Sequence, residues 1–275
     1  MNRPYISIII PTYNRAHLIN RAIESVLNQT YGKFELLVVD DCSNDDTESV
    51  VSSFDDFRIR YIKCDKNGGA AAARNRGIKE AKYDWIAFLD SDDVWRTDKL
   101  EKQVAAMDGV AGLVYCTFLR HPSDGTEETL MPSSDRSVDR RQGIMFGELL
   151  LGNFIGMPTI MVHKSVFNDA GLFDENLRCY EDYDFLLRAS QYTRFLHVDE
   201  VLVDVYETEG SVGLNPDRFF EAITKILAQY KSAYEEINFW QTKVEWLLGI
   251  AETFGMKEKI ENLLEERILE YTNSN

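Results

Sequence analysis

The hydrophobic pattern of the first hundred residues alternates between two kinds of segment. Short apolar runs rich in β-branched residues, typical of strands buried on both faces, lie at 5–10, 34–39, 59–64 and 85–89. Segments with helical spacing separate them, at 18–27 (with Asn14 as the expected N-cap), 47–54 and 70–82. This alternation predicts an α/β, Rossmann-like fold with a mostly parallel central sheet.

The pattern becomes less regular after residue 98. We expect helices at 99–107, 144–151, 165–170 and from Tyr183, strands at 112–118, 157–162 and within 195–206, and a mobile surface loop at 121–142. From Asp217 the apolar residues follow helical spacing only, which predicts amphipathic helices. The expected organisation is one sheet domain over 1–215, with halves 1–118 and 119–215, followed by a C-terminal α-helical extension over 216–275.

Acidic residues follow two of the predicted strands. Asp40 and Asp41 end the run at 34–39, and Asp90, Asp92 and Asp93 follow the run at 85–89. The carboxyl edge of a parallel sheet is where open α/β folds bind ligands, and carboxylates there suit a divalent cation shared with substrate phosphates. The alternative is an acidic turn that only caps the next helix.

Composition and missing motifs exclude several classes of protein. The net charge of −16 argues against a nucleic-acid partner. The first strand is followed by neither Gly-x-Gly-x-x-Gly nor a Walker-type loop, which argues against dinucleotide-binding and phosphate-loop enzymes. No apolar run approaches the roughly 18 residues of a spanning helix, and the N-terminus has no signal-peptide pattern, so we expect a soluble, cytoplasmic protein.

Five motifs occur in a fixed order along the chain. They are Ser-Ile-Ile-Ile-Pro-Thr-Tyr-Asn (7–14), Val-Val-Asp-Asp-Cys-Ser (38–43), Ala-Arg-Asn-Arg-Gly (73–77), Phe-Leu-Asp-Ser-Asp-Asp (88–93) and Tyr-Glu-Asp-Tyr-Asp (180–184). Together they resemble the inverting family 2 glycosyltransferases with the glycosyltransferase-A fold, over roughly residues 4–215. The resemblance implies transfer of a sugar from a nucleotide-sugar, most often a UDP-sugar, to an acceptor hydroxyl with inversion.

The resemblance also implies roles for individual residues in donor binding. The nucleotide-sugar would contact Pro11, Thr12, Tyr13, Arg15, Asp41, Arg74, Asn75, Asp90, Ser91 and Asp92. Within this set, Tyr13 would stack on the base, Asp41 would accept a hydrogen bond from uracil, and Arg74 and Asn75 would lie near the diphosphate. For Arg74 the alternative is a surface ion pair. Asp92 and Asp93 would bind the Mn²⁺ or Mg²⁺ that bridges the phosphates and stabilises the leaving group.

The last motif supplies the catalytic residue that the resemblance implies. Asp182 matches the general base that takes the proton of the acceptor hydroxyl, with Asp184 as the fallback. The alternative is that Glu181 and Asp182 only complement the dipole of the next helix. Many relatives have a His near the end of the domain that helps to bind metal; this chain has Glu209 there, which could replace it as an oxygen ligand.

Other functions stay open at this point. A sugar nucleotidyltransferase would carry a Gly-rich loop after the first strand, and a glycoside hydrolase needs no nucleotide or metal. A catalytically degenerate member acting as a nucleotide-binding or assembly subunit is the non-enzyme alternative. We expect a saccharide or lipid-linked acceptor and a role in bacterial cell-surface polysaccharide or glycolipid synthesis. The C-terminal helices could pack on the core, form a homodimer or contact the inner face of the membrane peripherally.

Overall fold

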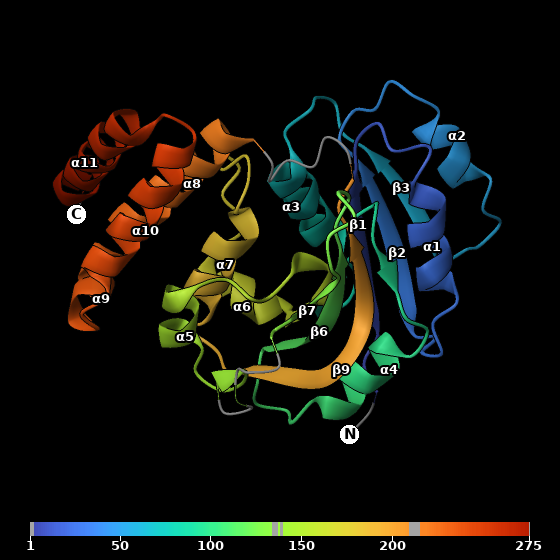
Figure 1. Cartoon of the computed structure of the whole chain (residues 1–275). Coiled ribbons are helices and arrows are strands. Elements are labelled where there is room, and N and C mark those ends of the chain that lie inside the picture. The colour runs from blue at the N-terminus through green and yellow to red at the C-terminus, as the bar shows by residue number, and fades with distance from the viewer. Residues whose placement is uncertain (1–2, 134–136, 138–139, 209–214, 275) are drawn as a thin grey trace.

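The first half of the chain forms a parallel sheet. The computed structural model describes residues 3–133, 137, 140–208 and 215–274. Strand β1 (Ile6–Thr12) lies between β2 (Phe34–Asp40) and β4 (Trp85–Phe88), with β3 (Ile59–Lys63) beyond β2 (Figure 1), and all four are parallel. Every residue of β1 and β2 is buried, which explains their continuous apolar runs. The predicted α/β fold is confirmed.

Helices cover both faces of this sheet because successive side chains of a strand point to opposite faces. Helices α1 (Ile19–Leu27), α2 (Thr47–Ser52) and α4 (Lys99–Ala106) share one hydrophobic cluster with Ile8 and Ile10 of β1. Helix α3 (Ala70–Glu80) packs on the opposite face, in the cluster that contains Ile9. The carboxyl ends of β1, β2 and β4 therefore stay uncovered at one edge of the sheet.

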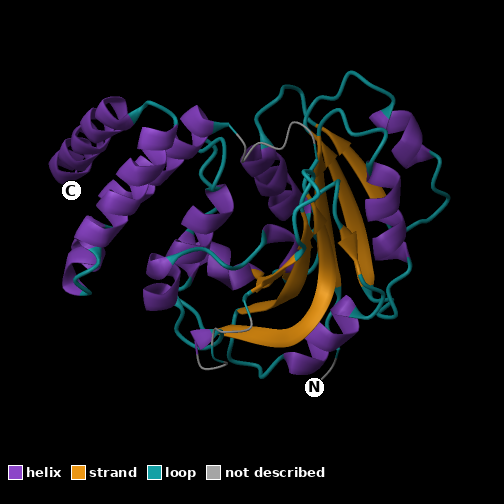
Figure 2. Cartoon of the chain, in the orientation of Figure 1, coloured by secondary structure: helices purple, strands orange, loops and turns teal. Residues whose placement is uncertain are grey.

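The second half extends the sheet and curls it (Figure 2). Strand β8 (Met161–His163) lies antiparallel between β4 and β6 (Leu113–His121), and the long β9 (Phe195–Tyr206) runs parallel to β6. Short β5 (Val94–Trp95) pairs with β9. The register between β6 and β9 shifts twice, between residues 116 and 118, and such irregularities bend a strand. Helices α5 (Phe146–Leu151), α6 (Lys164–Ala170) and α7 (Glu181–Ala189) belong to this second half, and the first turn of α7 reaches the open edge.

Four local predictions were wrong. Helix α1 begins at Ile19, four residues after the Thr-Tyr-Asn-Arg loop, so Asn14 is not its N-cap. The predicted loop at 121–142 contains β7 (Thr129–Met131), which pairs with an extended β6. The strand expected at 157–162 begins as a 3₁₀ turn over Met157–Thr159, where Pro158 has no N–H to donate to a ladder. Helix α7 begins at Glu181 rather than Tyr183, which places Asp182 in its first turn.

The C-terminal helices α8 (Pro216–Gln229), α9 (Lys231–Glu236), α10 (Trp240–Thr253) and α11 (Lys257–Ser274) pack against the side of the domain that carries α5 and α7 (Figure 1). Phe220, Leu247 and Leu264 of these helices belong to the same hydrophobic cluster as Leu149 and Tyr183. The extension therefore shares a core with the second half of the domain, residues 119–215. No helix in the described part of the chain combines the length and apolar character that crossing a bilayer requires.

This shared core predicts a large difference between two leucines of the extension. Leu247 is fully buried, whereas Leu269 is 62% exposed. We expect Leu247→Ala to lower the free energy of unfolding by about 2–5 kcal/mol and Leu269→Ala to change it by less than about 0.5 kcal/mol, since only the first leaves a cavity. Chemical denaturation of both variants measures this; equal, small losses would show that the extension does not contribute to the core.

Candidate active site

A cleft of about 1230 Å³ occupies the open edge of the sheet. Its walls come from the residues that follow β1 and β4, from the start of α3, from the end of β9 and from the first turn of α7. The predicted site residues that line it are Pro11, Thr12, Tyr13, Arg15, Asp41, Arg74, Asp90, Ser91, Asp92, Asp93 and Asp182. With Glu207, which also lines the cleft, four segments far apart in the sequence contribute carboxylates to one cavity.

The loop after β1 presents both a free aromatic face and an unsatisfied hydroxyl to the cleft. Tyr13 is 43% exposed, while Thr12 is buried and its Oγ1 has no hydrogen-bond partner among the described residues. Asn14 holds this loop in a left-handed backbone conformation, with φ of 52°. Its N–H donates to Ser43 Oγ (2.8 Å) and its Oδ1 accepts from the N–H of Asn44 (2.8 Å). Asn14 therefore ties together the loops that follow β1 and β2, instead of capping a helix.

The paired acids after β2 have separate roles. Asp40 is buried away from the cleft, where Oδ1 accepts from the N–H (2.8 Å) and the hydroxyl (2.6 Å) of Ser43 and Oδ2 accepts from the hydroxyl of Tyr61. Asp41 lines the cleft and accepts hydrogen bonds from the N–H groups of Gly68 (2.9 Å) and Gly69 (2.7 Å). Burial raises the pKa of Asp41. Asp40 thus supports the loop, and Asp41 faces the ligand space.

Arg74 connects the two halves of the domain. Its Nη2 contacts Asp90 Oδ1 at 2.7 Å and its Nη1 contacts Glu181 Oε1 at 2.6 Å, and the side chain is only 5% exposed. These two carboxylates raise the pKa of Arg74 against the opposing effect of burial. The ion pairs are buried, unlike the surface pair considered from the sequence. Arg74 therefore fixes the start of α7 relative to the end of β4, and its Nε has no hydrogen-bond partner among the described residues.

Asn75 is turned away from the cleft. Its amide donates to Phe173 O (2.9 Å) and Glu175 Oε1 (2.9 Å), and its Oδ1 accepts from the N–H of Phe173 (3.0 Å). The neighbouring Arg74 lines the cavity, but Asn75 is absent from the lining residues in the described chain. The expected diphosphate contact of Asn75 does not match this geometry, because its polar atoms hold the loop that precedes α7.

The carboxylates after β4 are crowded but differ in their partners. Asp92 Oδ2 accepts from Thr208 Oγ1 (2.8 Å) and lies 3.9 Å from Arg15 Nη2. Asp93 is buried, with Oδ1 accepting from the N–H of Tyr206 (2.9 Å). Burial, together with the charges of Asp90 and Asp92, raises the pKa of Asp93 well above its usual range. A cation at this edge would relieve that crowding.

The donor set at this edge suits a metal ion held partly by the substrate. No group of three or more His, Cys, Asp or Glu side chains in the described ranges is arranged to enclose a metal ion by itself. Glu209, the predicted third ligand, lies outside the described residues. Mg²⁺ and similar hard cations typically bind one or two carboxylates and take their other oxygens from water and substrate phosphates. Asp92, partly exposed at the cleft, fits such a role.

Asp182 lies opposite this acidic edge, in the first turn of α7. Tyr180, the residue before α7, has a left-handed backbone conformation with φ of 58°, which is rare for a residue other than glycine. This conformation sets the direction in which α7 begins. Burial and then the adjacent Glu181 raise the pKa of Asp182 to about 7, although Arg74 opposes them. Asp184 instead points into the core and pairs with Arg188 at 2.7 Å. Asp182, not Asp184, faces the cleft.

Sequence reasoning missed several cations that surround the cleft. Arg120, Arg178 and Arg218 come from β6, from the segment before α7 and from α8, and all three line the cavity. Arg178 reaches across to the first half of the domain, where its Nη1 donates to Gly68 O at 3.1 Å. Together with Arg15 and Arg74 these three side chains place five arginines beside the seven carboxylates that line the cleft among the described residues, and Arg120 pairs with one of these, Glu207. The three missed arginines belong to none of the five motifs, although Arg178 lies two residues before the first residue of the last one, Tyr180.

The first half of the domain is a parallel sheet with acids at its carboxyl edge. These acids face a carboxylate at the start of a helix from the second half of the domain. This is the arrangement of glycosyltransferase-A enzymes. The model of the family "Glycosyl transferase family 2" matches residues 7–171, more than half of the chain. The chain belongs to this family.

Proteins similar to this chain in sequence are named as glycosyltransferases. An uncharacterized glycosyltransferase of Haemophilus influenzae is 29% identical over 92% of this chain and 86% of its own length. A putative teichuronic acid biosynthesis glycosyltransferase of Bacillus subtilis is 33% identical over 59% of this chain and 63% of its own. A UDP-Glc:α-D-GlcNAc-diphosphoundecaprenol β-1,3-glucosyltransferase of Escherichia coli is 50% identical over 37% of this chain and 40% of its own. For the last two, the match spans less than two thirds of the relative.

Solved structures support the fold. TarS residues 1–349 from S. aureus, in complex with UDP-GlcNAc, superimposes with a TM-score of 0.68 at 19% identity, covering 97% of this chain and 89% of that one. A mannosyltransferase of Pyrobaculum calidifontis, in complex with GDP-Man and Mn²⁺, gives a TM-score of 0.62 at 16% identity, covering 100% of this chain and 77% of that one. At these identities the likeness concerns the fold alone.

Proposed function

We propose that this protein is an inverting, metal-dependent glycosyltransferase that transfers a sugar from a UDP-sugar to an acceptor hydroxyl. The observation that carries the proposal is the single cleft in which Asp182 faces the carboxylates that follow β2 and β4, with Arg74 joined to both sides. Family membership supports sugar transfer, and the complexes of structural neighbours with UDP-GlcNAc and GDP-Man support a nucleotide-sugar as the donor.

The donor nucleoside would bind between the loops that follow β1 and β2. Tyr13 offers an exposed ring for stacking on the base, and the buried hydroxyl of Thr12, which has no hydrogen-bond partner among the described residues, would bond to a polar ligand atom. Asp41 accepts hydrogen bonds from backbone N–H groups and keeps lone pairs for the N–H of a uracil ring. Pro11, Arg15 and Ser91 complete this part of the cleft. The expected specificity for UDP rests chiefly on Asp41.

The diphosphate would lie at the edge formed by Asp90, Asp92 and Asp93. Asp92 and Asp93, with Glu209 as a further oxygen ligand, would hold the Mn²⁺ or Mg²⁺. When bound, this ion supplies Lewis-acid stabilisation of the negative charge on the departing diphosphate. Arg15, at 3.9 Å from Asp92, would orient that carboxylate and offer its remaining donors to a phosphate.

Asp182 would act as the general base. The acceptor hydroxyl loses its proton to the Asp182 carboxylate while its oxygen forms a bond to the anomeric carbon. The bond from that carbon to the diphosphate oxygen breaks, and its electron pair leaves with the nucleoside diphosphate. Attack from the face opposite the leaving group inverts the anomeric configuration. The first turn of α7 faces the acidic edge across the cleft, which suits this in-line arrangement.

The acceptor is proposed to belong to bacterial polysaccharide or glycolipid synthesis, as the names of several relatives indicate for those proteins. A catalytically degenerate nucleotide-binding subunit is the second candidate, and activity separates the two. Calorimetric titration with UDP, with and without Mn²⁺, tests donor binding, and incubation with UDP-sugars tests for release of UDP. Mn²⁺-dependent binding with turnover supports the enzyme; binding without any turnover favours the subunit. Binding of dTDP or GDP in place of UDP would reassign the donor.

The raised pKa of Asp182 predicts a pH dependence. Because its pKa is about 7 in the folded protein, the carboxylate is protonated below that pH and cannot accept the hydroxyl proton. We expect kcat/KM to fall about tenfold per pH unit below about pH 7 and to level off above it. A profile measured with saturating Mn²⁺ checks this. A midpoint near 4, the ordinary range of an aspartate, would contradict it.

A further inference from the structure

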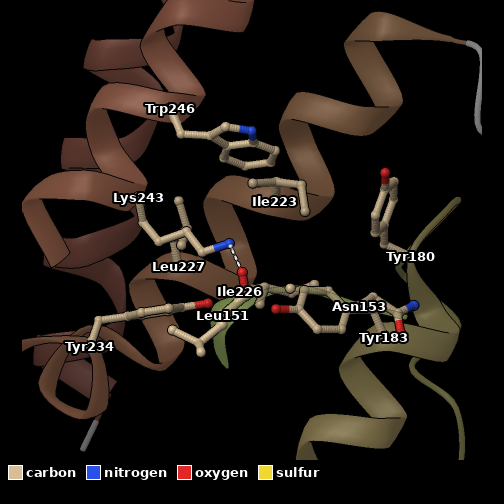
Figure 3. A pocket seen from close by; sticks show the side chains of 11 residues that line it. Leu151, Asn153, Tyr180, Tyr183, Ile223, Ile226, Leu227, Tyr234, Lys243 and Trp246 are labelled. Carbon is tan, nitrogen blue, oxygen red and sulfur yellow. Dashed lines mark hydrogen bonds between the residues drawn. The ribbon is translucent and has the colours of Figure 1, made fainter. Parts of the chain in front are cut away.

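A second, smaller pocket of about 260 Å³ lies between the second half of the domain and the C-terminal helices (Figure 3). Its lining residues are Leu151, Gly152, Asn153, Tyr180, Tyr183, Ile223, Ile226, Leu227, Tyr234, Lys243 and Trp246. Asn153 and Tyr180 line the main cleft as well, so the two cavities adjoin at these side chains. Most of the lining lies outside residues 7–171, the part matched by the family model.

The pocket combines an apolar surface with one cation. Four aliphatic and four aromatic side chains form its walls, and no carboxylate is among its lining residues in the described chain. The sequence as a whole has 46 acidic and 30 basic residues, so a lining with a single positive charge and no negative one is unlike the rest of the surface. Such a lining favours a ligand that is both apolar and anionic.

Lys243 supplies that cation. Its ammonium points into the pocket (Figure 3), where it donates to Leu151 O at 2.9 Å and lies 4.9 Å from the ring centroid of Trp246. An ammonium has three N–H donors, and Leu151 O is its one hydrogen-bond acceptor among the described residues. Burial lowers the pKa of Lys243, and no carboxylate is among the described residues that line the pocket with it. A phosphate oxygen would compensate the charge of the ammonium.

Two simpler ligands fit this lining less well. A free saccharide needs several hydrogen-bond acceptors for its hydroxyls, and the carboxylates that commonly provide them are not among the described residues of the lining. A hydrocarbon alone would bury the ammonium of Lys243 further without a counter-charge, which is unfavourable. A volume of about 260 Å³ is below the usual size of a site for a whole drug-sized ligand, so it suits one portion of a larger acceptor.

We propose that this pocket binds the phosphate-linked apolar portion of the acceptor, with the phosphate on Lys243 and the first part of the chain against Ile226, Leu227 and Trp246. The acceptor sugar would extend past Tyr180 into the main cleft, where Asp182 is two residues further along the chain. This inference rests on the proposed function and specifies its acceptor class: a sugar joined through phosphate to a lipid.

Geranyl diphosphate, a short isoprenoid diphosphate, is the probe for this pocket. It is titrated by calorimetry into the full chain saturated with UDP and Mn²⁺, so that the donor site is occupied. We expect Lys243→Met to weaken its binding about tenfold or more, because a hydrogen bond between charged groups is lost. Trp246→Ala should also weaken it. Lys257→Met, which removes an exposed charge of the same extension whose ion pair is with Glu252, should leave it within about twofold. Geraniol and inorganic pyrophosphate should each bind more weakly than the joined probe.

Three results would overturn the inference: no binding of geranyl diphosphate, equal binding by the Lys243→Met variant, or equal binding of inorganic pyrophosphate. Binding of free N-acetylglucosamine that depends on Trp246, without binding of the isoprenoid, would instead make the pocket a saccharide subsite. UDP titration of the same proteins separates the two proposals. If the unmodified chain binds UDP but not the isoprenoid, only the acceptor class is refuted. If the unmodified chain does not bind UDP, the proposed function itself is refuted.

Discussion

Asp182→Asn is expected to lower kcat for sugar transfer by about 10²–10⁴-fold, the usual contribution of a general base, while UDP binding stays unchanged. The amide keeps the size of the side chain but cannot take the acceptor proton. The carboxylates proposed to bind the donor come from other segments, after β2 and β4, so we expect the substitution to leave the nucleotide contacts in place. Initial rates of UDP release with acceptor, together with calorimetric titration of UDP, measure the two effects separately.

Asp169→Asn is the matched control for this experiment. Asp169 is an exposed aspartate of α6 in the same half of the domain and is not among the residues that line the cleft. It should retain full transfer activity. If the Asp182→Asn variant kept near-normal transfer, the assignment of the base would be wrong. If it lost UDP binding as well, the substitution would have disturbed Arg74 and its ion pair with Glu181 rather than the chemistry alone.

Asp92→Asn is expected to abolish transfer and also to weaken UDP binding in the presence of Mn²⁺, by about a hundredfold or more, since metal assistance is worth several kcal/mol. The amide oxygen can still accept the hydrogen bond from Thr208 Oγ1, so the loop should keep its position. What is lost is the charge that holds the cation against the diphosphate. Titrations of UDP with Mn²⁺ and with a chelator, on both proteins, measure this.

The comparison without metal makes this prediction specific. In chelator, the unmodified protein and the Asp92→Asn variant should bind UDP with similar, weak affinity, because the carboxylate then contributes no metal contact. Asp55→Asn, an exposed aspartate outside the cleft, should behave as the unmodified protein under both conditions. A UDP affinity independent of both Mn²⁺ and Asp92 would mean that the arginines around the cleft neutralise the diphosphate. The metal-binding role proposed for Asp92 would then be wrong.

Much of the fold was predictable from local sequence. The strands β1, β2 and β4 are buried on both faces, so their apolar runs are continuous and easily recognised. The acids at the ends of β2 and β4 mark the edge of the sheet where such folds bind ligands, because parallel strands all end there. The five motifs then indicated the family, which the match over residues 7–171 confirms. The residue roles within the site remain predictions.

The tertiary structure decided how the motif residues are used. Adjacent residues of α3 point in different directions, so Arg74 reaches Glu181, 107 residues away in the chain, while Asn75 holds the loop before α7. Periodicity could not decide between Asp182 and Asp184 because the choice depends on the left-handed Tyr180 that starts α7. Likewise, Lys243 is an ordinary helical lysine in the sequence and becomes the only cation of an apolar pocket among its described lining residues only when α10 packs on the domain. Local patterns determine which segments are buried, whereas contacts between distant segments determine which polar atoms remain free to bind a ligand.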